Sequence, residues 1–319
     1  MSVLMQDTGG YAGFGALPFS HPKYHDKIMS KVYERDFLRE ITNSDITERI
    51  TDCSQTVQII KAPEVAPWRP YQINQQMVNS SVSTTAISLS ICYAAYQSLK
   101  FDQLTIHYAC ENWAQFEEKI LEGCYEAFVA EQREWVFTAM VAEVDPNNRG
   151  NNAGIHGNIP LGDVGSPRVI TRSTLLQEMQ NLRLVLDERL AFVRNDTFIL
   201  VPPIINNVII ESNVANHAWI GGSGGSMAID GAWSGKLVGF NIYETGHLLV
   251  SMDTMGPCYY VLAGHSSAFA YASEIVRSRV VEGIDSWSTI YQMLAVWGGA
   301  MLYPEYLALG YWYFDPTAP

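Results

Sequence analysis

The chain has few charged residues, and basic ones are the scarcest. Charged side chains make up 17% of its 319 residues and hydrophobic ones 48%, whereas about 25% charged is usual in a soluble domain. We therefore expect other protein to cover much of its surface. The net charge of -13 comes without any basic run, and neutralising phosphates requires clustered Lys and Arg. This composition excludes an ordinary nucleic-acid reader, and any contact with DNA should be loose.

Paired cysteines and long apolar runs are also absent. The five cysteines are odd in number and scattered without C-x-x-C spacing, which indicates neither a disulfide framework nor a zinc site: Cys53, Cys92, Cys110, Cys124 and Cys258. We expect reduced, mostly buried thiols. The start, MSVLMQDTGG, lacks a basic segment followed by an apolar core, and no apolar stretch reaches about 18 residues. We expect neither a signal peptide nor a membrane span, and no cofactor is indicated.

The first hundred residues predict an arm and a ribbon. Residues 1–25 contain GGYAGFGALPF, which forms no regular element and suggests an arm that orders against another surface. A short amphipathic helix is expected over 26–41. Alternating apolar residues predict strands near 57–59 and 87–93, on either side of a segment rich in Pro, Gln and Asn. Because an isolated two-stranded ribbon is marginally stable in water, its apolar face should lie on its own body or on a neighbouring subunit.

Two helices stand out further along the chain. Apolar residues three or four apart over 111–144 predict a rod of roughly 50 Å. Residues 146–172, dense in Gly, Asn and Pro, predict a long irregular connection. A second helix should follow, capped by Ser173 or Thr174. Its predicted apolar stripe consists of Leu175, Met179, Leu182, Leu186 and Leu190.

The rest of the chain predicts strands and one more helix. Residues 198–203, FILVPP, should form a buried strand that ends at a double proline. Ser266 or Ser267 is expected to cap a helix, with strands after it near 290–294 and 306–314. The buried side of that helix would carry Ala268, Phe269, Ala272, Ile275 and Val276. The overall fold class is α+β.

One motif of hydrolytic enzymes occurs, at residues 221–225. The sequence GGSGG fits G-x-S-x-G, with Asp230 or Asp253 and His265 downstream. A nucleophile elbow needs a buried strand before the serine and a helix after it, but Gly231 and Gly235 interrupt any helix here. We favour a flexible loop and keep a serine hydrolase using Ser223 as an alternative.

The seven histidines form no pair with the spacing of metal ligands on a helix. His21 and His25 are four residues apart, but Pro22 disfavours a helix there. We therefore assign no metal site. His265 follows an apolar run and should hydrogen-bond to the backbone of a turn.

Three segments near the C-terminus carry a family resemblance. They are the G-x-x-x-G-F-x-I-Y-x-T hairpin at 235–245, the apolar run with Ala-Gly-His at 261–268, and the ending with Pro-Glu-x-Leu-Ala at 298–308. In this order they resemble the C-terminal part of the major capsid proteins of short-tailed double-stranded DNA bacteriophages, which have the Hong Kong 97-like fold. The resemblance implies four parts. They are an N-terminal arm (1–52), an extended β-hairpin loop (53–106), a peripheral domain with a long spine helix (107–146 and 251–319) and an axial domain (147–250).

The resemblance also implies a function, that of a structural coat protein rather than an enzyme. Hexamers and pentamers of the chain would form an icosahedral phage head around double-stranded DNA. Implied partners are a separate scaffolding protein, a portal protein and packaged DNA in loose contact; residues 146–172 would bind a decoration protein or be simply a loop. The protein would be made in the bacterial cytoplasm and reside in the virion shell. A ring-forming virion component is the other alternative.

The abundant aromatic residues favour contact surfaces, since no interleaved basic residues turn them into a base-stacking platform. We expect Lys61, Arg69 and Lys100 to meet acidic helix residues of neighbouring copies. The candidate intersubunit contacts are Lys61, Trp68, Arg69, Tyr71, Lys100, Glu117, Glu118 and Glu131.

Overall fold

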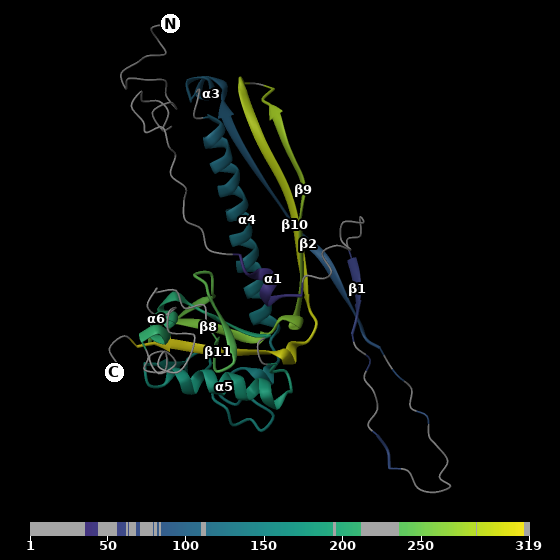
Figure 1. The fold of residues 1–319 in the computed structure, drawn as a ribbon, viewed down its shortest axis with the longest axis vertical. Coiled ribbons are helices and arrows are strands. Elements are labelled where there is room, and N and C mark those ends of the chain that lie inside the picture. Colours follow the sequence, from purple (N-terminus) through teal and green to yellow (C-terminus); the bar gives the residue numbers. More distant parts are fainter. Residues whose placement is uncertain are drawn as a thin grey trace. The chain divides into compact units, whose positions relative to one another are not determined.

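A computed structural model describes residues 36–43, 56–61, 63, 68–70, 79, 82, 84–109, 113–193, 196–211, 236–284 and 286–315 (Figure 1). The described residues fall into two compact units. Unit 1 contains Tyr93–Gln132 and Ser273–Trp297, and unit 2 contains Phe37–Cys92, Arg133–Ala272 and Gly298–Pro319. The predicted N-terminal arm over 1–25 lies outside the described residues. Of the helix expected over 26–41, the described part is α1 (Leu38–Ile41).

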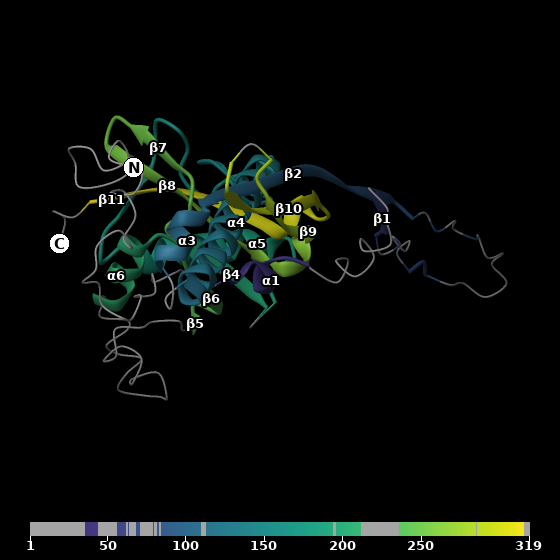
Figure 2. The ribbon, with the colours of Figure 1, turned by 90° about the horizontal axis from the view of Figure 1, so that it is seen from above.

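Unit 1 contains the larger part of one long helix and of three long strands. Helix α4 (Trp113–Glu143) has 31 residues, roughly 46 Å at 1.5 Å per residue, which confirms the predicted helix. It follows α3 (Gln103–Ala109) and lies along strands β2 (Ala86–Asp102), β10 (Ser288–Met301) and β9 (Phe269–Glu282) (Figures 1 and 2). Trp297 fixes this packing. Tyr93 stacks on its ring at 6.1 Å, and Phe128 of α4 meets it edge-on at 5.7 Å.

The predicted ribbon strands are confirmed, but they are not isolated. Strand β1 (Thr56–Ile60) pairs antiparallel with the start of β2, with Val57 opposite Leu89. The full sheet has the order β1-β2-β10-β9. Within unit 2, Leu89 is buried with Ala270, Ala272 and Leu302. The apolar face of the ribbon's base is therefore covered by its own chain.

Unit 2 contains a seven-stranded sheet with the order β3-β11-β8-β4-β6-β5, in which β7 also pairs with β8. Pairing is antiparallel except between β11 and β3 and between β4 and β6. The strands are β3 (Arg168–Ile170), β4 (Thr197–Val201), β5 (Lys236–Leu237), β6 (Phe240–Glu244), β7 (Val250–Asp253), β8 (Gly256–His265) and β11 (Leu307–Phe314). Short 3-10 turns lie at Pro146–Asn148, Ser266–Ala268 and Pro304–Tyr306.

Two helices, α5 (Leu175–Glu188) and α6 (Pro203–Glu211), bury their apolar faces in the core of unit 2. Four of the five residues of the predicted stripe are confirmed as buried: Leu175, Met179, Leu182 and Leu186. The fifth, Leu190, was predicted wrongly. The helix ends at Glu188, and Leu190 lies beyond it with a φ of 55° and 90% exposed. Thr174 stands at the predicted N-cap position, but its hydroxyl accepts the N–H of Thr171 rather than capping α5.

The hairpin of β5 and β6 confirms the strand pair predicted for 235–245. Its two loop residues, Val238 and Gly239, have φ values of 57° and 92°, as a type I′ turn requires. A Cβ at Gly239 would overlap the ring of Phe192. Nη1 of Arg183 donates to the carbonyl oxygen of Val238 at 3.1 Å, so α5 holds the turn in place.

Two local predictions were wrong or incomplete. The helix expected after Ser266 is a single 3-10 turn followed by strand β9. Ile275 and Val276, expected on its buried side, are 43% and 51% exposed. Branched side chains of this kind favour a strand. Helix α6 was missed: the double proline does end β4, but Pro203 is also the first residue of α6, a position where proline is tolerated.

The glycine-rich connection over 146–172 is largely irregular, as predicted, but its residues Arg168–Ile170 form strand β3. The connection is fastened at two places. The buried Asn148 side chain donates to the carbonyl oxygens of Glu305 and Leu307 at 2.9 and 2.8 Å. Oδ2 of Asp253 accepts the N–H of Gly165 at 2.7 Å and the hydroxyl of Tyr311 at 3.3 Å. Hydrogen bonds from the backbone N–H groups of Gly165 and Thr254 hold the pKa of Asp253 below its usual value, and burial raises the pKa of Tyr311 to about 12.

Replacing Gly162 by alanine should destabilise unit 2 far more than replacing Gly165. Both residues have positive φ values, +92° and +84°, but a Cβ at Gly162 would overlap the carbonyl oxygen of Tyr311 whereas Gly165 has no atom within 4 Å. We expect Gly165→Ala to cost about 1–2 kcal/mol of backbone strain and Gly162→Ala to cost clearly more. Chemical denaturation of both variants measures the difference. Equal losses of unfolding free energy in the two variants would contradict the close approach of Gly162 to Tyr311.

Protection of the Gly165 amide should fall in acid. Because the pKa of folded Asp253 is depressed, the stability it contributes is present above its unfolded pKa of about 3.9 and is lost as pH falls through the lower folded value. Hydrogen exchange at Gly165, measured against Asp253→Asn, tests this. The variant has no titrating group at this position, so the protection of its Gly165 amide should not fall with pH in this range. Identical profiles would refute the assignment.

Candidate assembly surfaces

Unit 1 has an apolar groove between α4 and its sheet, which we call the helix–sheet groove. Its volume is about 240 Å³. Strand β2 contributes Tyr96 and Gln97, α4 contributes Tyr125 and Phe128, and β9 contributes Ile275. The remaining lining residues are Ala95, Cys124, Ala127, Glu131, Met293 and Ala295. Tyr96 is 79% exposed and Tyr125 is 48% exposed, so the groove opens to the surface with its aromatic walls accessible.

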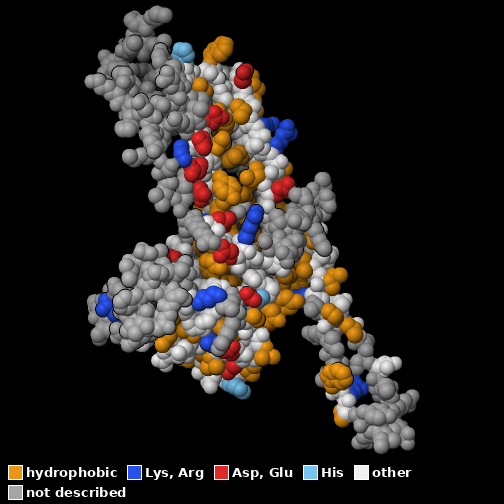
Figure 3. Space-filling view, in the orientation of Figure 1, with side chains coloured by type: hydrophobic (Ala, Val, Ile, Leu, Met, Phe, Trp, Pro, Cys, Tyr) orange, Lys and Arg blue, Asp and Glu red, His pale blue; other side chains and the backbone are white. Residues whose placement is uncertain are grey.

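One acidic side chain, Glu131, lines the helix–sheet groove. Between residues 113 and 132, α4 carries five glutamates and one lysine, and acidic side chains gather in a row on this part of the molecule (Figure 3). Lys119 pairs with Glu122 on the same helix at 2.6 Å. A partner of this surface therefore needs an apolar group next to a positive charge.

Cys124 lies in the wall of the groove. It is 6% exposed, and burial raises the pKa of its thiol. Cys92, on β2, is exposed. The expectation of mostly buried thiols thus holds for Cys124 and Cys258 and is wrong for Cys92, while Cys53 and Cys110 lie outside the described residues.

The second surface is the outer edge of β9 and the turn that follows it. The eight residues 275–282 are all exposed, among them Val276, Val280 and Val281. Asn43 pairs with the edge of β9 at Ala270. Beyond that point, the part of the chain that the structure describes supplies no strand on this side of β9. Such an edge is a template for pairing with another chain.

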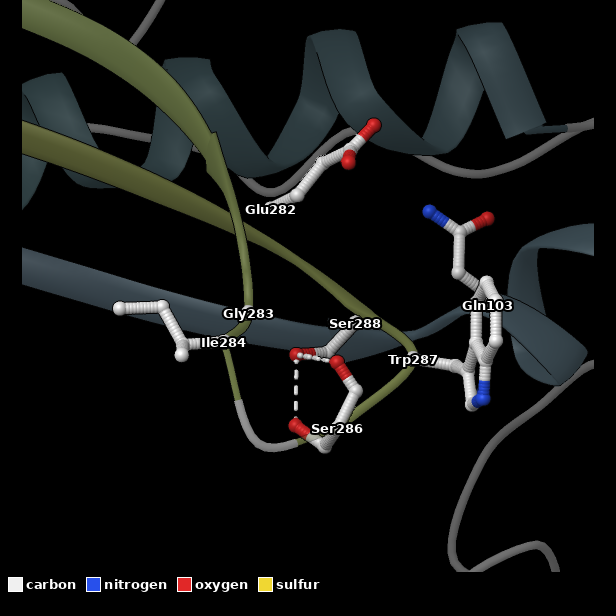
Figure 4. Close-up of a pocket in the computed structure, with 7 residues that line it drawn as sticks. All are labelled: Gln103, Glu282, Gly283, Ile284, Ser286, Trp287 and Ser288. Atoms are coloured by element: carbon white, nitrogen blue, oxygen red, sulfur yellow. Dashed lines mark hydrogen bonds between the residues drawn. The ribbon is translucent and has the colours of Figure 1, made fainter.

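The turn between β9 and β10 displays two large apolar side chains. Ile284 is 99% exposed and Trp287 is 88% exposed, and they point away from each other (Figure 4). A hollow of about 700 Å³ lies between this turn and Gln103. The backbone N–H of Gln103 donates to the carbonyl oxygen of Trp287 at 2.9 Å, which ties the turn to the start of α3.

The third surface follows β1. Lys61 lies over the ring of Tyr303, 4.7 Å from its centroid, so this predicted contact residue interacts within its own chain. Trp68 is 101% exposed, and its neighbour Arg69 is exposed as well. An indole this accessible is a typical interface anchor.

The other predicted contact residues are distributed over unit 1. Lys100 is exposed on β2, and Glu118 and Glu131 are exposed on α4, where Glu117 is half-buried. Of these residues, Glu131 lines the helix–sheet groove; Tyr71 lies outside the described residues. Sequence reasoning did not identify Tyr96, Tyr125, Ile275, Ile284 or Trp287 as surface contact residues. Their exposure depends on strand pairing between segments far apart in the chain.

His265 has the structural role predicted for it. Its Nδ1 accepts the N–H of Ser267 at 3.2 Å and lies 2.7 Å from the hydroxyl of the same residue. Asp253, one acid proposed for a serine hydrolase, pairs opposite Gly256 at the far end of β8. Nine residues of strand, roughly 30 Å, separate it from His265. Ser223 and Asp230 lie outside the described residues.

The described residues include no group of three or more His, Cys, Asp or Glu placed to hold a metal ion. Nor does any helix within them have the length and apolar character needed to cross a membrane.

Family models and curated proteins contain no match to the sequence, but solved structures match nearly its whole length. A chain from Mycobacterium phage Che8 superposes with a TM-score of 0.63 and 16% identity, covering 94% of this chain and 98% of that one. The capsid of cyanophage P-SCSP1u superposes with a TM-score of 0.66 and 11% identity, covering 92% of this chain and 93% of that one. The capsid of Ralstonia phage GP4 superposes with a TM-score of 0.62 and 8% identity, covering 95% of this chain and 97% of that one. The chain thus has the fold of bacteriophage capsid proteins, as its C-terminal segments predict.

In the unassembled chain, Cys92 should react with a maleimide at least about ten times faster than Cys124. The thiolate is the reactive form, and burial both shields Cys124 and raises its pKa. Peptide mapping after timed labelling measures the two rates. Similar rates would mean that the groove wall is open around Cys124.

Proposed function

We propose that this chain is the major capsid protein of a double-stranded DNA bacteriophage with a short tail. Copies of it would assemble as hexamers and pentamers into an icosahedral head that encloses the genome. The observation that carries the proposal is the likeness to phage capsid structures over more than nine tenths of the chain. The exposed apolar surfaces of both units support it, because large exposed apolar patches mark contact sites.

In this proposal the four parts implied by the sequence have separate tasks. Residues 1–52 are an arm that straps a neighbour, and 53–106 form a loop lying across an adjacent subunit. Residues 107–146 and 251–319 form the peripheral domain on the long helix, and 147–250 form the axial domain near the capsomer centre. Many modest contacts made at once then hold the shell, since linked contacts raise avidity far above any single affinity.

The charge of the chain bears on its contact with DNA and with neighbouring copies. With a net charge of -13, the shell lining repels DNA, but salt screens this repulsion beyond about 8 Å, so the genome needs only loose contact. Lys61, Arg69 and Lys100 would face Glu117, Glu118 and Glu131 of neighbouring copies. A separate scaffolding protein, a portal protein and a decoration protein at 146–172 complete the set. The protein would be made in the bacterial cytoplasm and reside in the virion shell.

Electron microscopy of the purified chain, expressed alone and together with a scaffolding protein, tests the proposal. We expect closed shells. Single rings would favour a portal-like or tail component instead, and a chain that stays monomeric under both conditions would contradict a shell role.

Deleting residues 62–83 and closing the gap with a short glycine linker should abolish shell formation. The unfolding transition should be retained, because β1 and β2 keep their pairing. Circular dichroism and thermal unfolding provide the control for folding. Shells of normal appearance from the shortened chain would show that the loop does not hold neighbours together.

A further inference from the structure

Building on the proposed function, we infer that Trp68 of one copy inserts into the helix–sheet groove of a second copy. The structure shows both halves of this contact in one chain: an anchor exposed to solvent on the segment after β1 and an open apolar groove in unit 1.

The anchor is well suited to an interface. Trp68 is 101% exposed, so its whole indole ring is in water in the single chain. Burying a ring of this size is strongly favourable, and its two side-chain torsions lose little entropy on docking. Tryptophan is also enriched among the residues that dominate binding energy.

The groove has the size and lining for this ring. An apolar cavity of about 150 Å³ binds benzene, and the helix–sheet groove measures about 240 Å³, which leaves room for the second ring of an indole. Tyr96, Tyr125 and Phe128 offer edges and faces for aromatic contacts. The sulfur atoms of Cys124 and Met293 add polarisable contacts.

Polar groups at the groove match those of the anchor. A buried indole N–H needs an acceptor, and Glu131 and Gln97 line the groove with side-chain oxygens. Arg69 follows Trp68 in the chain and would meet the carboxylate of Glu131 in the groove lining. Complementary charges of this kind speed association and fix the orientation of the partner.

A second tryptophan that is exposed among the described residues, Trp287, matches the groove poorly. Trp287 lies on the turn after Glu282, with Asp285 two residues before it in the sequence. Its acidic neighbours would face Glu131 of the groove, and like charges at an interface disfavour docking. Of these two tryptophans, Trp68, with its adjacent arginine, is therefore the better match.

A crosslink in assembled shells tests the contact. Cysteines are placed at Pro70, next to the anchor, and at Ala127, in the groove wall, so that Trp68, Arg69 and Glu131 stay intact. Cys53, Cys92 and Cys110 are replaced by serine. A short bismaleimide should then join two chains into a species of twice 35.6 kDa. The matched control is Pro70→Cys with Thr138→Cys, since Thr138 is exposed on α4 but does not line the groove; it should give little product.

Adding Trp68→Ala to the Pro70→Cys, Ala127→Cys chain should lower the crosslinking rate about 30-fold, the effect of truncating an interface hot spot. Trp68→Phe keeps an aromatic anchor and should retain most of the rate. Shells that form without a Pro70 to Ala127 crosslink, or with one inside a single chain, would overturn the contact and leave the capsid proposal intact. If the chain without substitutions forms no shell, the capsid proposal itself is wrong.

Discussion

The mutual burial of α4 and the long strands is the constraint on which the structure depends. A helix of 31 residues and strands of 14 to 17 residues expose too much apolar surface to be stable singly. In unit 1, Trp297 meets Phe128 of α4 and Tyr93 of β2. In unit 2, Trp135 of α4 meets Phe269 of β9, and Phe137 stacks with Phe37. Aromatic contacts therefore secure the helix along its length.

The two units bury their surfaces to different degrees. Unit 2 closes a core around Trp312, Phe240 and Met179, with α5 and α6 packed on its sheet. Among the residues that the structure describes, the strands of unit 1 leave an edge, a turn and a groove open to solvent. A chain that completes one core and leaves apolar residues of another region uncovered has surface available for contact with further protein.

Much of the local structure could be predicted from the sequence. The residues over 111–144 repeat with helical spacing and contain no proline, so α4 was predicted nearly to its ends. Gly239 supports the I′ turn of the hairpin. Strand β9 was taken for a helix because its first residues, small and aromatic, fit either period. Its pairing with β10 decides the outcome, and a sequence pattern does not show which segments will pair.

The candidate sites were predictable only in part. Trp68 and Glu131 could be named as contact residues from the sequence, because a tryptophan in a polar segment and a glutamate on a helix can be recognised from their immediate neighbours in the chain. The helix–sheet groove could not be predicted, since four elements separated by up to two hundred residues line it. Tyr96 and Ile275 acquire a role only when β2, β10 and β9 lie next to α4.

The open edge of β9 has a consequence for the free subunit. Val276, Val280 and Val281 form the kind of β-branched, exposed stretch that promotes aggregation when strands of separate molecules meet. Arg277 and Arg279 interrupt that stretch, and charged residues on an edge oppose indiscriminate stacking. The two arginines thus oppose the pairing of this edge with the same edge of another copy.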